Sequence, residues 1–216
     1  MLRVLPCGLP LTNSVRGEPL VRNLLFAACP AFLLIGGAAA SAHTKIYTTT
    51  MSGPNEFPAN ASPGVGSSTV TIDTDSLTMR VQAEFSGLLG TVTAAHIHGP
   101  IPDPPANPLA SVATTSPSFT GFPTGVTAGT YDHTYDLTQT SSYHPNFVSA
   151  NGGTAAGAMN AFIAGMDAGK MYFNIHSSQF GGGEIRGFMQ LVPEPSAFML
   201  GGLGAAGLLA RRRRTT

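Results

Sequence analysis

The chain has 216 residues, of which 43% are hydrophobic and only 10% are charged, and its formal net charge at pH 7 is zero. This composition excludes a basic nucleic-acid-binding protein, a coiled coil and a polytopic membrane protein. The apolar fraction is sufficient for one domain with its own core, and the zero charge is an average over three unlike segments.

Residues 1–42 predict a secretory signal peptide with a signal helix. Arginines precede an uncharged apolar stretch at 24–35, and the stretch ends in small residues that include Ala40 and Ala42. We expect signal peptidase to cut after Ala42. The alternative, an uncleaved membrane anchor, is disfavoured by Pro30 and by the Gly-Ala tail.

Both cysteines of the chain, Cys7 and Cys29, lie inside this leader. The exported chain would therefore contain no disulfide, no thiol nucleophile and no cysteine-ligated zinc, and its stability would depend on core burial.

The middle segment, residues 43–192, carries four basic and nine acidic side chains, a net charge of −5. A negative charge disfavours binding to nucleic acid or to anionic lipid. The positive charge that balances the chain lies mostly in the two end segments.

Short strands dominate the middle segment. Residues 77–85 alternate apolar and polar side chains with a period of two, which is typical of a half-buried strand. A turn at 73–76 joins this strand to a β-branched run, which predicts a hairpin. About seven short strands separated by turns predict an antiparallel β-sandwich or barrel. The expected strands are 45–51, 68–72, 77–85, 92–98, 131–137, 170–176 and 184–191.

One short helix is expected between the last strands. Met159, Phe162, Ile163 and Met166 form one apolar stripe at helical spacing, with Thr154 as its N-cap and Gly169 at its C-terminal end. The segment 99–129 contains seven prolines, so we expect a long surface loop there.

The histidines supply the clearest candidate chemistry. His96 and His98 lie on one face of their strand, about 6.7 Å apart in backbone rise. On a later strand His176 shares a face with Tyr172 and Asn174. If the two strands are near neighbours, the three histidines form a three-nitrogen site suited to zinc or copper.

The sequence favours a structural role for these histidines, with their rings fixed by backbone carbonyls, and the metal site is the alternative. His133 shares a face with Tyr131 and Tyr135 and is expected to be a packed core histidine. No Gly-x-Ser-x-Gly motif or catalytic constellation occurs, so the sequence favours a non-enzymatic protein.

Glu184 and Arg186 follow a run of three glycines. At positions i and i+2 of a strand they would share a face, where they would form a cross-strand ion pair. The alternative is a charge network that holds the His-x-His segment. The glycines indicate a tight turn or bulge, and the absence of a following Lys-Ser/Thr excludes a nucleotide-binding loop.

The last 24 residues combine three parts in a fixed order. Pro193, Glu194 and Pro195 precede an apolar run at 197–210, which is followed by Arg211, Arg212, Arg213 and Arg214. The run predicts a single transmembrane helix of ~22 Å, short of a ~30 Å hydrocarbon core, with the arginines held in the cytoplasm. A simple tail anchor is the alternative.

This ending resembles the PEP-CTERM sorting signal of Gram-negative bacteria that make exopolysaccharide. The resemblance implies transient insertion in the inner membrane, cleavage by an exosortase, and release or re-anchoring at the cell envelope.

Four motifs in the middle segment resemble the CHRD domain, a module named from chordin. They are Ala94-Ala95-His96-Ile97-His98-Gly99-Pro100, Ala164-Gly165, Met171-Tyr172-Phe173-Asn174-Ile175-His176-Ser177 and Gly183-Glu184-Ile185-Arg186-Gly187. The resemblance covers most of residues 43–192. It implies an immunoglobulin-like β-sandwich, distantly similar to copper/zinc superoxide dismutase, and no settled activity.

Two functions remain open on this evidence. The first is an exported, non-enzymatic binding or matrix component that contacts envelope or exopolysaccharide components and needs no cofactor. The second is a secreted zinc- or copper-binding protein, redox active in one form, that uses His96, His98 and His176.

Overall fold

The computed structural model describes residues 43–102 and 109–193. Buried and more exposed side chains alternate along several of its strands, as expected. The strands are β1 Thr44–Ser52, β2 Val65–Asp73, β3 Thr78–Ser86, β4 Val92–His98, β5 Gly129–Asp136, β6 Tyr172–Ser177, β7 Ile185–Phe188 and β8 Gln190–Leu191. The helices are α1 Pro145–Ala150 and α2 Ala155–Asp167, with 3₁₀ turns η1 Gly53–Asn55 and η2 Thr140–Ser142. The mainly β prediction is confirmed.

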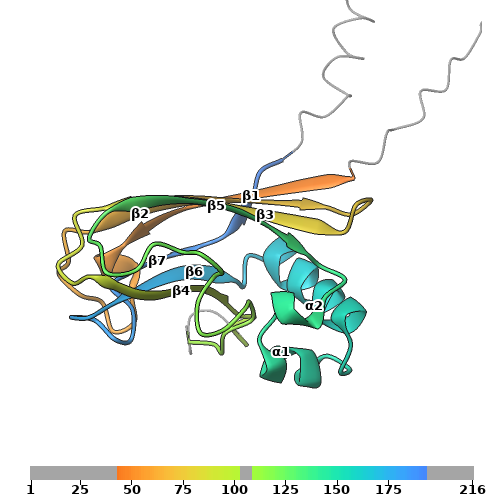
Figure 1. Cartoon of the computed structure of the whole chain (residues 1–216). Helices are drawn as coiled ribbons and strands as arrows, with labels where there is room; N and C mark the ends of the chain where they lie inside the picture. The colour runs from red at the N-terminus through yellow and green to blue at the C-terminus, as the bar shows by residue number, and fades with distance from the viewer. Residues whose placement is uncertain (1–42, 103–108, 194–216) are drawn as a thin grey trace, which may run out of the picture. The chain divides into compact units, whose positions relative to one another are not determined.

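All the strands belong to one antiparallel sheet in the order β4-β6-β7-β1-β2-β3-β5, and β8 pairs with β1. Strands β1 and β7 meet at a single pair, Ser52 with Arg186. The sheet curls there into a half-barrel, so that β4, β6 and β7 face β1, β2, β3 and β5 across the core (Figure 1). The expected sandwich of two separate sheets is therefore one continuous sheet.

The core lies between these two layers. Tyr47, Val70 and Val81 are neighbours in register on β1, β2 and β3, and all three are fully buried. Phe173 and Ile175 of β6 are buried on the opposite side. Each such side chain contributes about 1.5–3 kcal/mol through removal from water.

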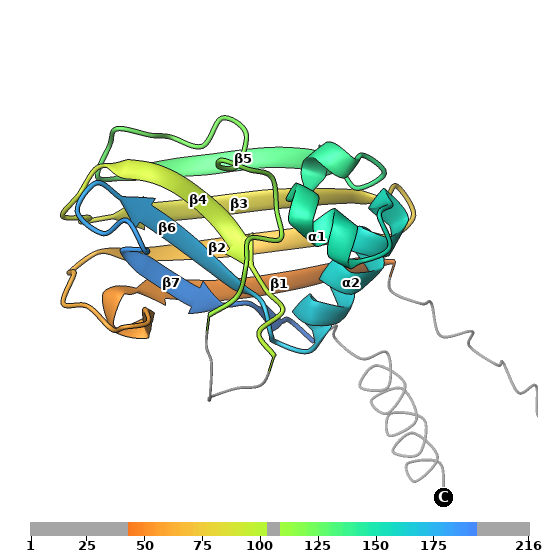
Figure 2. The same cartoon turned by 90° about the horizontal axis from the view of Figure 1, so that it is seen from below.

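The predicted helix is α2. The Thr154 side chain accepts a hydrogen bond from the Gly157 N–H (3.1 Å), and Gly169 has a φ of +64° just beyond the helix end. The Asp167 carboxylate accepts hydrogen bonds from Lys45 (2.6 Å) and Tyr47 (2.7 Å), which fixes α2 against β1 (Figure 2). A second helix, α1, precedes it, so the expectation of one helix was wrong.

The proline-rich segment is irregular with many exposed residues, as predicted, but it also contributes to the core. Phe119 and Phe122 of its described part are buried. The Phe119 N–H donates to the Ala95 carbonyl (3.0 Å), so the segment packs along β4. Its irregular backbone covers the free edge of β4 as a result.

The predictions for the two ends of the chain lie largely outside the described residues. This holds for the signal helix, for Ala40 and Ala42, for Glu194 and Pro195, for the transmembrane helix and for Arg211–Arg214. Within residues 43–102 and 109–193, no helix is long and apolar enough to cross a membrane.

Candidate metal site

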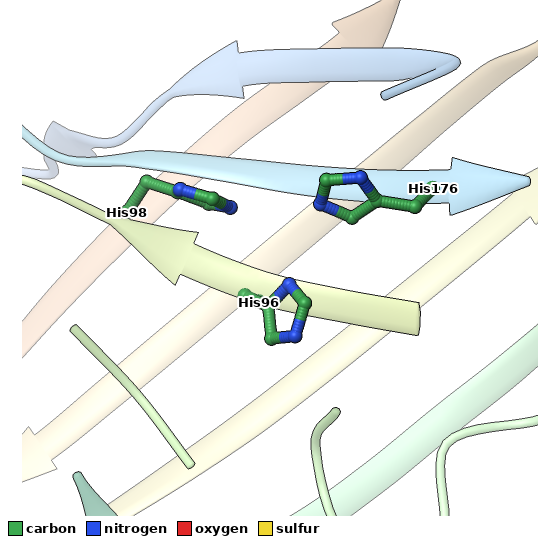
Figure 3. Close-up of side chains that lie close together, drawn as sticks. All are labelled: His96, His98 and His176. Atoms are coloured by element: carbon green, nitrogen blue, oxygen red, sulfur yellow. The ribbon is translucent and has the colours of Figure 1, made fainter. Parts of the chain in front are cut away.

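The pairing of β4 with β6 places the candidate histidines together. The two strands are antiparallel, with His96 opposite Asn174 and His98 opposite Tyr172. His176 lies opposite Ala94, two positions along the same face. The three rings converge over the outer face of these strands (Figure 3), and we call them the histidine cluster.

The distances within the histidine cluster are short. One ring nitrogen of each residue lies within 4.8 Å of the corresponding nitrogen of the other two. The ring centroids are separated by 5.2 Å (His96 and His176), 5.5 Å (His96 and His98) and 5.7 Å (His98 and His176). His133 lies apart from them, half-buried between the rings of Tyr131 and Tyr135.

Backbone carbonyls fix the tautomer of every ring in the cluster. The pairs are His96 Nε2 with Pro117 (2.5 Å), His98 Nδ1 with Ala110 (2.9 Å) and His176 Nδ1 with Gly181 (3.0 Å). A carbonyl oxygen only accepts, so each of these nitrogens carries the proton and donates it. The other nitrogen of each neutral ring keeps a free lone pair.

Those free lone pairs have no partner in the protein. The nitrogens concerned are buried and make no hydrogen bond: His96 Nδ1, His98 Nε2 and His176 Nε2. A buried polar atom without a partner costs about 1–3 kcal/mol, and three of them in one place need an explanation.

Burial also sets the charge of the cluster. It lowers the pKa of His96 and of His98 to about 4, and it lowers the pKa of His176 below its ordinary value. The hydrogen bonds to carbonyls oppose this shift but do not outweigh it. The rings are therefore neutral at pH 7, which is the form that binds metals.

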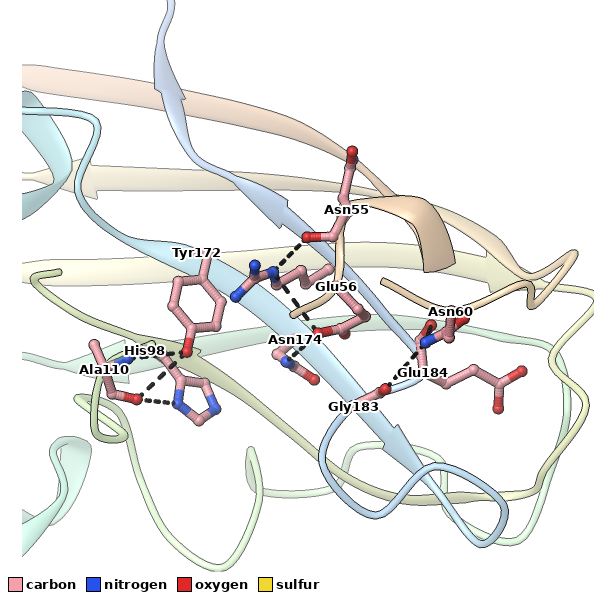
Figure 4. Close-up of polar contacts among 10 residues, drawn as sticks. Asn55, Glu56, Asn60, His98, Ala110, Tyr172, Asn174, Gly183 and Glu184 are labelled. Atoms are coloured by element: carbon pink, nitrogen blue, oxygen red, sulfur yellow. Dashed lines mark hydrogen bonds and ion pairs between the residues drawn. The ribbon is translucent and has the colours of Figure 1, made fainter. Parts of the chain in front are cut away.

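An aromatic and cationic layer supports the cluster from the β7 side. The Tyr172 ring stacks on His98 with centroids 5.0 Å apart, and the Arg186 guanidinium lies 4.9 Å from the Tyr172 ring centroid. The Tyr172 hydroxyl also contacts the backbone of Ala110, which accepts from His98 (Figure 4).

Two residues that were not predicted as site residues, Glu56 and Asn174, complete this layer. One carboxylate oxygen of Glu56 lies 3.7 Å from Arg186 Nε, and the Asn174 side-chain amide donates a hydrogen bond to the same oxygen (3.4 Å). Burial raises the pKa of Glu56 to about 7, although Arg186 and Asn174 oppose the shift. The alternation of side chains along its strand places Asn174 on the same face as His176, so the sequence could have indicated it. No sequence pattern connects Glu56 with the histidines.

The expected ion pair between Glu184 and Arg186 is wrong. Arg186 interacts with Glu56 and donates to the Asn55 carbonyl (2.5 Å). Glu184 is fully buried and precedes the first residue of β7, so the side-chain alternation of the strand does not apply to it.

The Glu184 carboxylate instead ties two loops together. It accepts hydrogen bonds from Ser62 Oγ (2.6 Å) and from the backbone N–H groups of Leu89 (2.5 Å) and Gly90 (3.2 Å). Burial alone would raise the pKa of Glu184, but these bonds and one from Ser177 hold it below its usual value. We call this arrangement the Glu184 clamp.

The cluster presents three neutral imidazole donors on rigid neighbouring strands. Each ring is oriented by a hydrogen bond from its other nitrogen, the arrangement that metal-ligating histidines adopt. The donor set suits zinc or copper.

Comparisons with known proteins identify two segments. The CHRD domain matches residues 47–189, and the PEP-CTERM protein-sorting motif matches residues 191–214. No curated protein and no solved structure shows significant similarity to the chain.

Proposed function

The chain belongs to the CHRD domain family and carries a PEP-CTERM sorting signal, which directs it across the inner membrane to the cell envelope or surface, and on this premise we propose that it is an exported metal-binding protein. The histidine cluster binds one zinc or copper ion. Its role at the envelope is binding rather than catalysis.

One observation carries the proposal: the unpaired, buried nitrogen that each ring directs into the cluster. A purely structural role explains the nitrogen that donates to a carbonyl but leaves the second nitrogen of each ring without a function. A bound metal ion accounts for all three lone pairs at once.

Metal titration of the purified full chain tests the proposal. We expect one zinc or copper ion per chain, and a stabilisation of about 2.7 kcal/mol when the free metal is at 100 times its Kd. The His96→Ala/His98→Ala variant should bind none and show no thermal shift. A wild-type chain with no bound metal and no shift would refute the proposal.

A matrix role is supported by the outer face of the layer that β1, β2, β3 and β5 form. Thr50, Ser67, Glu84 and Thr130 form one exposed row across β1, β2, β3 and β5. Such hydroxyl-rich surface suits contact with hydrated exopolysaccharide. Cosedimentation of the full chain with host exopolysaccharide should therefore exceed that of a Thr50→Glu/Thr130→Glu variant, and equal recovery would reject this role.

Processing is the third part of the proposal. Signal peptidase removes residues 1–42, and an exosortase cuts near Pro193–Pro195 after transient insertion of the C-terminal segment in the inner membrane. Intact-mass measurement on protein from the native host should show loss of the segment from residue 197 onward. A species that retains Arg211–Arg214 would refute cleavage.

A further inference from the structure

We propose that the histidine cluster is selective for cuprous copper, and that it holds Cu(I) in preference to Cu(II) and Zn(II). The inference rests on the metal binding proposed above and specifies which ion, in which oxidation state, the site takes. Three features of the structure point to a monovalent ion: the charge of the ligands, the burial of the site and a nearby fixed cation.

The ligands bring no negative charge. Among the described residues, the group that could hold a metal consists of the three histidines, with no Asp, Glu or Cys in it. Glu56 bonds to Asn174 and lies beside Arg186 instead. A divalent ion would therefore keep a net charge of +2 in the site, whereas Cu(I) would keep +1.

The site penalises the higher charge because it is buried. The three ligand nitrogens are inaccessible to solvent. The cost of moving an ion out of water rises with the square of its charge, so a divalent ion loses about four times as much solvation as a monovalent one.

Arg186 adds a fixed positive charge beside the site. Its guanidinium packs over Tyr172, which stacks directly on His98, so one ring separates the cation from a ligand. The Glu56 carboxylate, with one oxygen 3.7 Å from Arg186 Nε, offsets part of this charge.

The number of donors agrees with this choice. A d¹⁰ Cu(I) ion is satisfied by three imidazoles, whereas Zn(II) takes a fourth ligand and Cu(II) prefers a tetragonal set. The carbonyls of Pro117, Ala110 and Gly181 around the cluster already accept hydrogen bonds from the rings. A divalent ion would therefore have to bring water into a largely buried space.

Competition measurements on the full chain test the inference. Cu(I) affinity is measured anaerobically against a chromophoric Cu(I) chelator, and Zn(II) and Cu(II) affinities against their own chromophoric chelators. We expect Cu(I) to bind at least ~100-fold more tightly than Zn(II), and the bound copper couple to have a higher midpoint potential than aqueous copper. Tighter binding of Zn(II), or a lower potential, overturns the inference while metal binding stands. Failure of all three ions to bind overturns both.

Two charge variants with opposite expected effects test the physical cause. Arg186→Gln removes the fixed cation and should lower the ratio of Cu(I) to Cu(II) affinity about tenfold, which is ~59 mV in potential. Arg186→Lys is its charge-conserving control. Glu56→Gln removes the compensating carboxylate and should raise the ratio, which tests the electrostatic cause even if Arg186→Gln fails to fold. A ratio that Glu56→Gln leaves unchanged or lowers overturns the electrostatic argument.

Discussion

The histidine cluster and the Glu184 clamp both contain buried polar atoms on or next to strands β4, β6 and β7, yet their hydrogen bonding differs. Both oxygens of Glu184 accept hydrogen bonds, from Ser62, Leu89 and Gly90. In the cluster, only one nitrogen of each ring has a partner, and the other is unpaired. The saturated group stabilises two loops, whereas the half-saturated group has capacity left for a ligand. Between these two regions, the difference lies in hydrogen-bond saturation rather than in burial.

The largest expected effect is a loss of metal affinity when a residue of the histidine cluster is replaced. His176→Gln removes one of the three donors, and it should weaken Cu(I) or Zn(II) binding by more than ~100-fold, since even outer-shell changes cost 10–100-fold. Chelator competition measures the loss. The matched control is His133→Gln, at a half-buried histidine outside the cluster, which should retain wild-type affinity. Equal weakening in both variants would contradict the assignment.

Replacement of Glu184 in the clamp should lower the stability of the chain but leave its metal affinity nearly unchanged. Glu184→Gln replaces a carboxylate by an amide whose N–H₂ group faces backbone donors, so the free energy of unfolding should fall by about 3 kcal/mol. Urea denaturation measures this change, and Glu84→Gln, at an exposed position on β3, should cost less than ~0.5 kcal/mol. Metal affinity should stay within about threefold of wild type. A stable Glu184→Gln chain would show that the clamp is dispensable.

Acid should destabilise the metal-free cluster. His96 and His98 have folded-state pKa values of about 4 against an ordinary 6.5, so between these pH values the unfolded chain binds more protons. The free energy of unfolding therefore falls as the pH falls through this window, by up to ~1.4 kcal/mol per pH unit for each histidine.

Urea denaturation at pH 7 and at pH 4.5 measures this loss. A His96→Asn/His98→Asn variant should lose less stability between the two pH values than the wild-type chain does. Glu56 and Glu184 titrate in both proteins, so their contributions cancel in the comparison. Identical losses would show that the two rings are not held neutral.

The smallest effect concerns the layer behind the cluster. Tyr172→Phe keeps the ring stacked on His98 but removes the hydroxyl that contacts the Ala110 backbone. We expect a loss of about 1 kcal/mol in stability and a few-fold loss in metal affinity. Thermal unfolding and chelator competition measure the two changes. A loss of affinity as large as that of His176→Gln would mean that Tyr172 is itself a ligand.

The sequence predicts those features that depend on local side-chain alternation. The strand at 77–85 and the shared faces of His96 with His98 and of Tyr172 with His176 follow from the period of two. The N-cap at Thr154 follows from the preference of helix starts for hydroxyl side chains.

The remaining features depend on contacts that leave no local pattern. The pairing of β4 with β6 is a long-range contact across an irregular segment, strand β5 and two helices. The carbonyls of Pro117, Ala110 and Gly181 are backbone groups in irregular segments, so no side-chain signal marks them. The Glu184–Arg186 prediction failed because Gly183, with a φ of +131°, redirects the chain just before β7.

The central claim is that His96 Nδ1, His98 Nε2 and His176 Nε2 share one metal ion. Nitrogen-15 NMR of the histidine side chains, with one equivalent of diamagnetic Zn(II) or Cu(I), tests it atom by atom. We predict that these three nitrogens shift on metal addition while the nitrogens bonded to Pro117, Ala110 and Gly181 keep their protons. Shifts confined to the three histidines outside the cluster, His43, His133 and His144, or no shifts at all, would contradict the account.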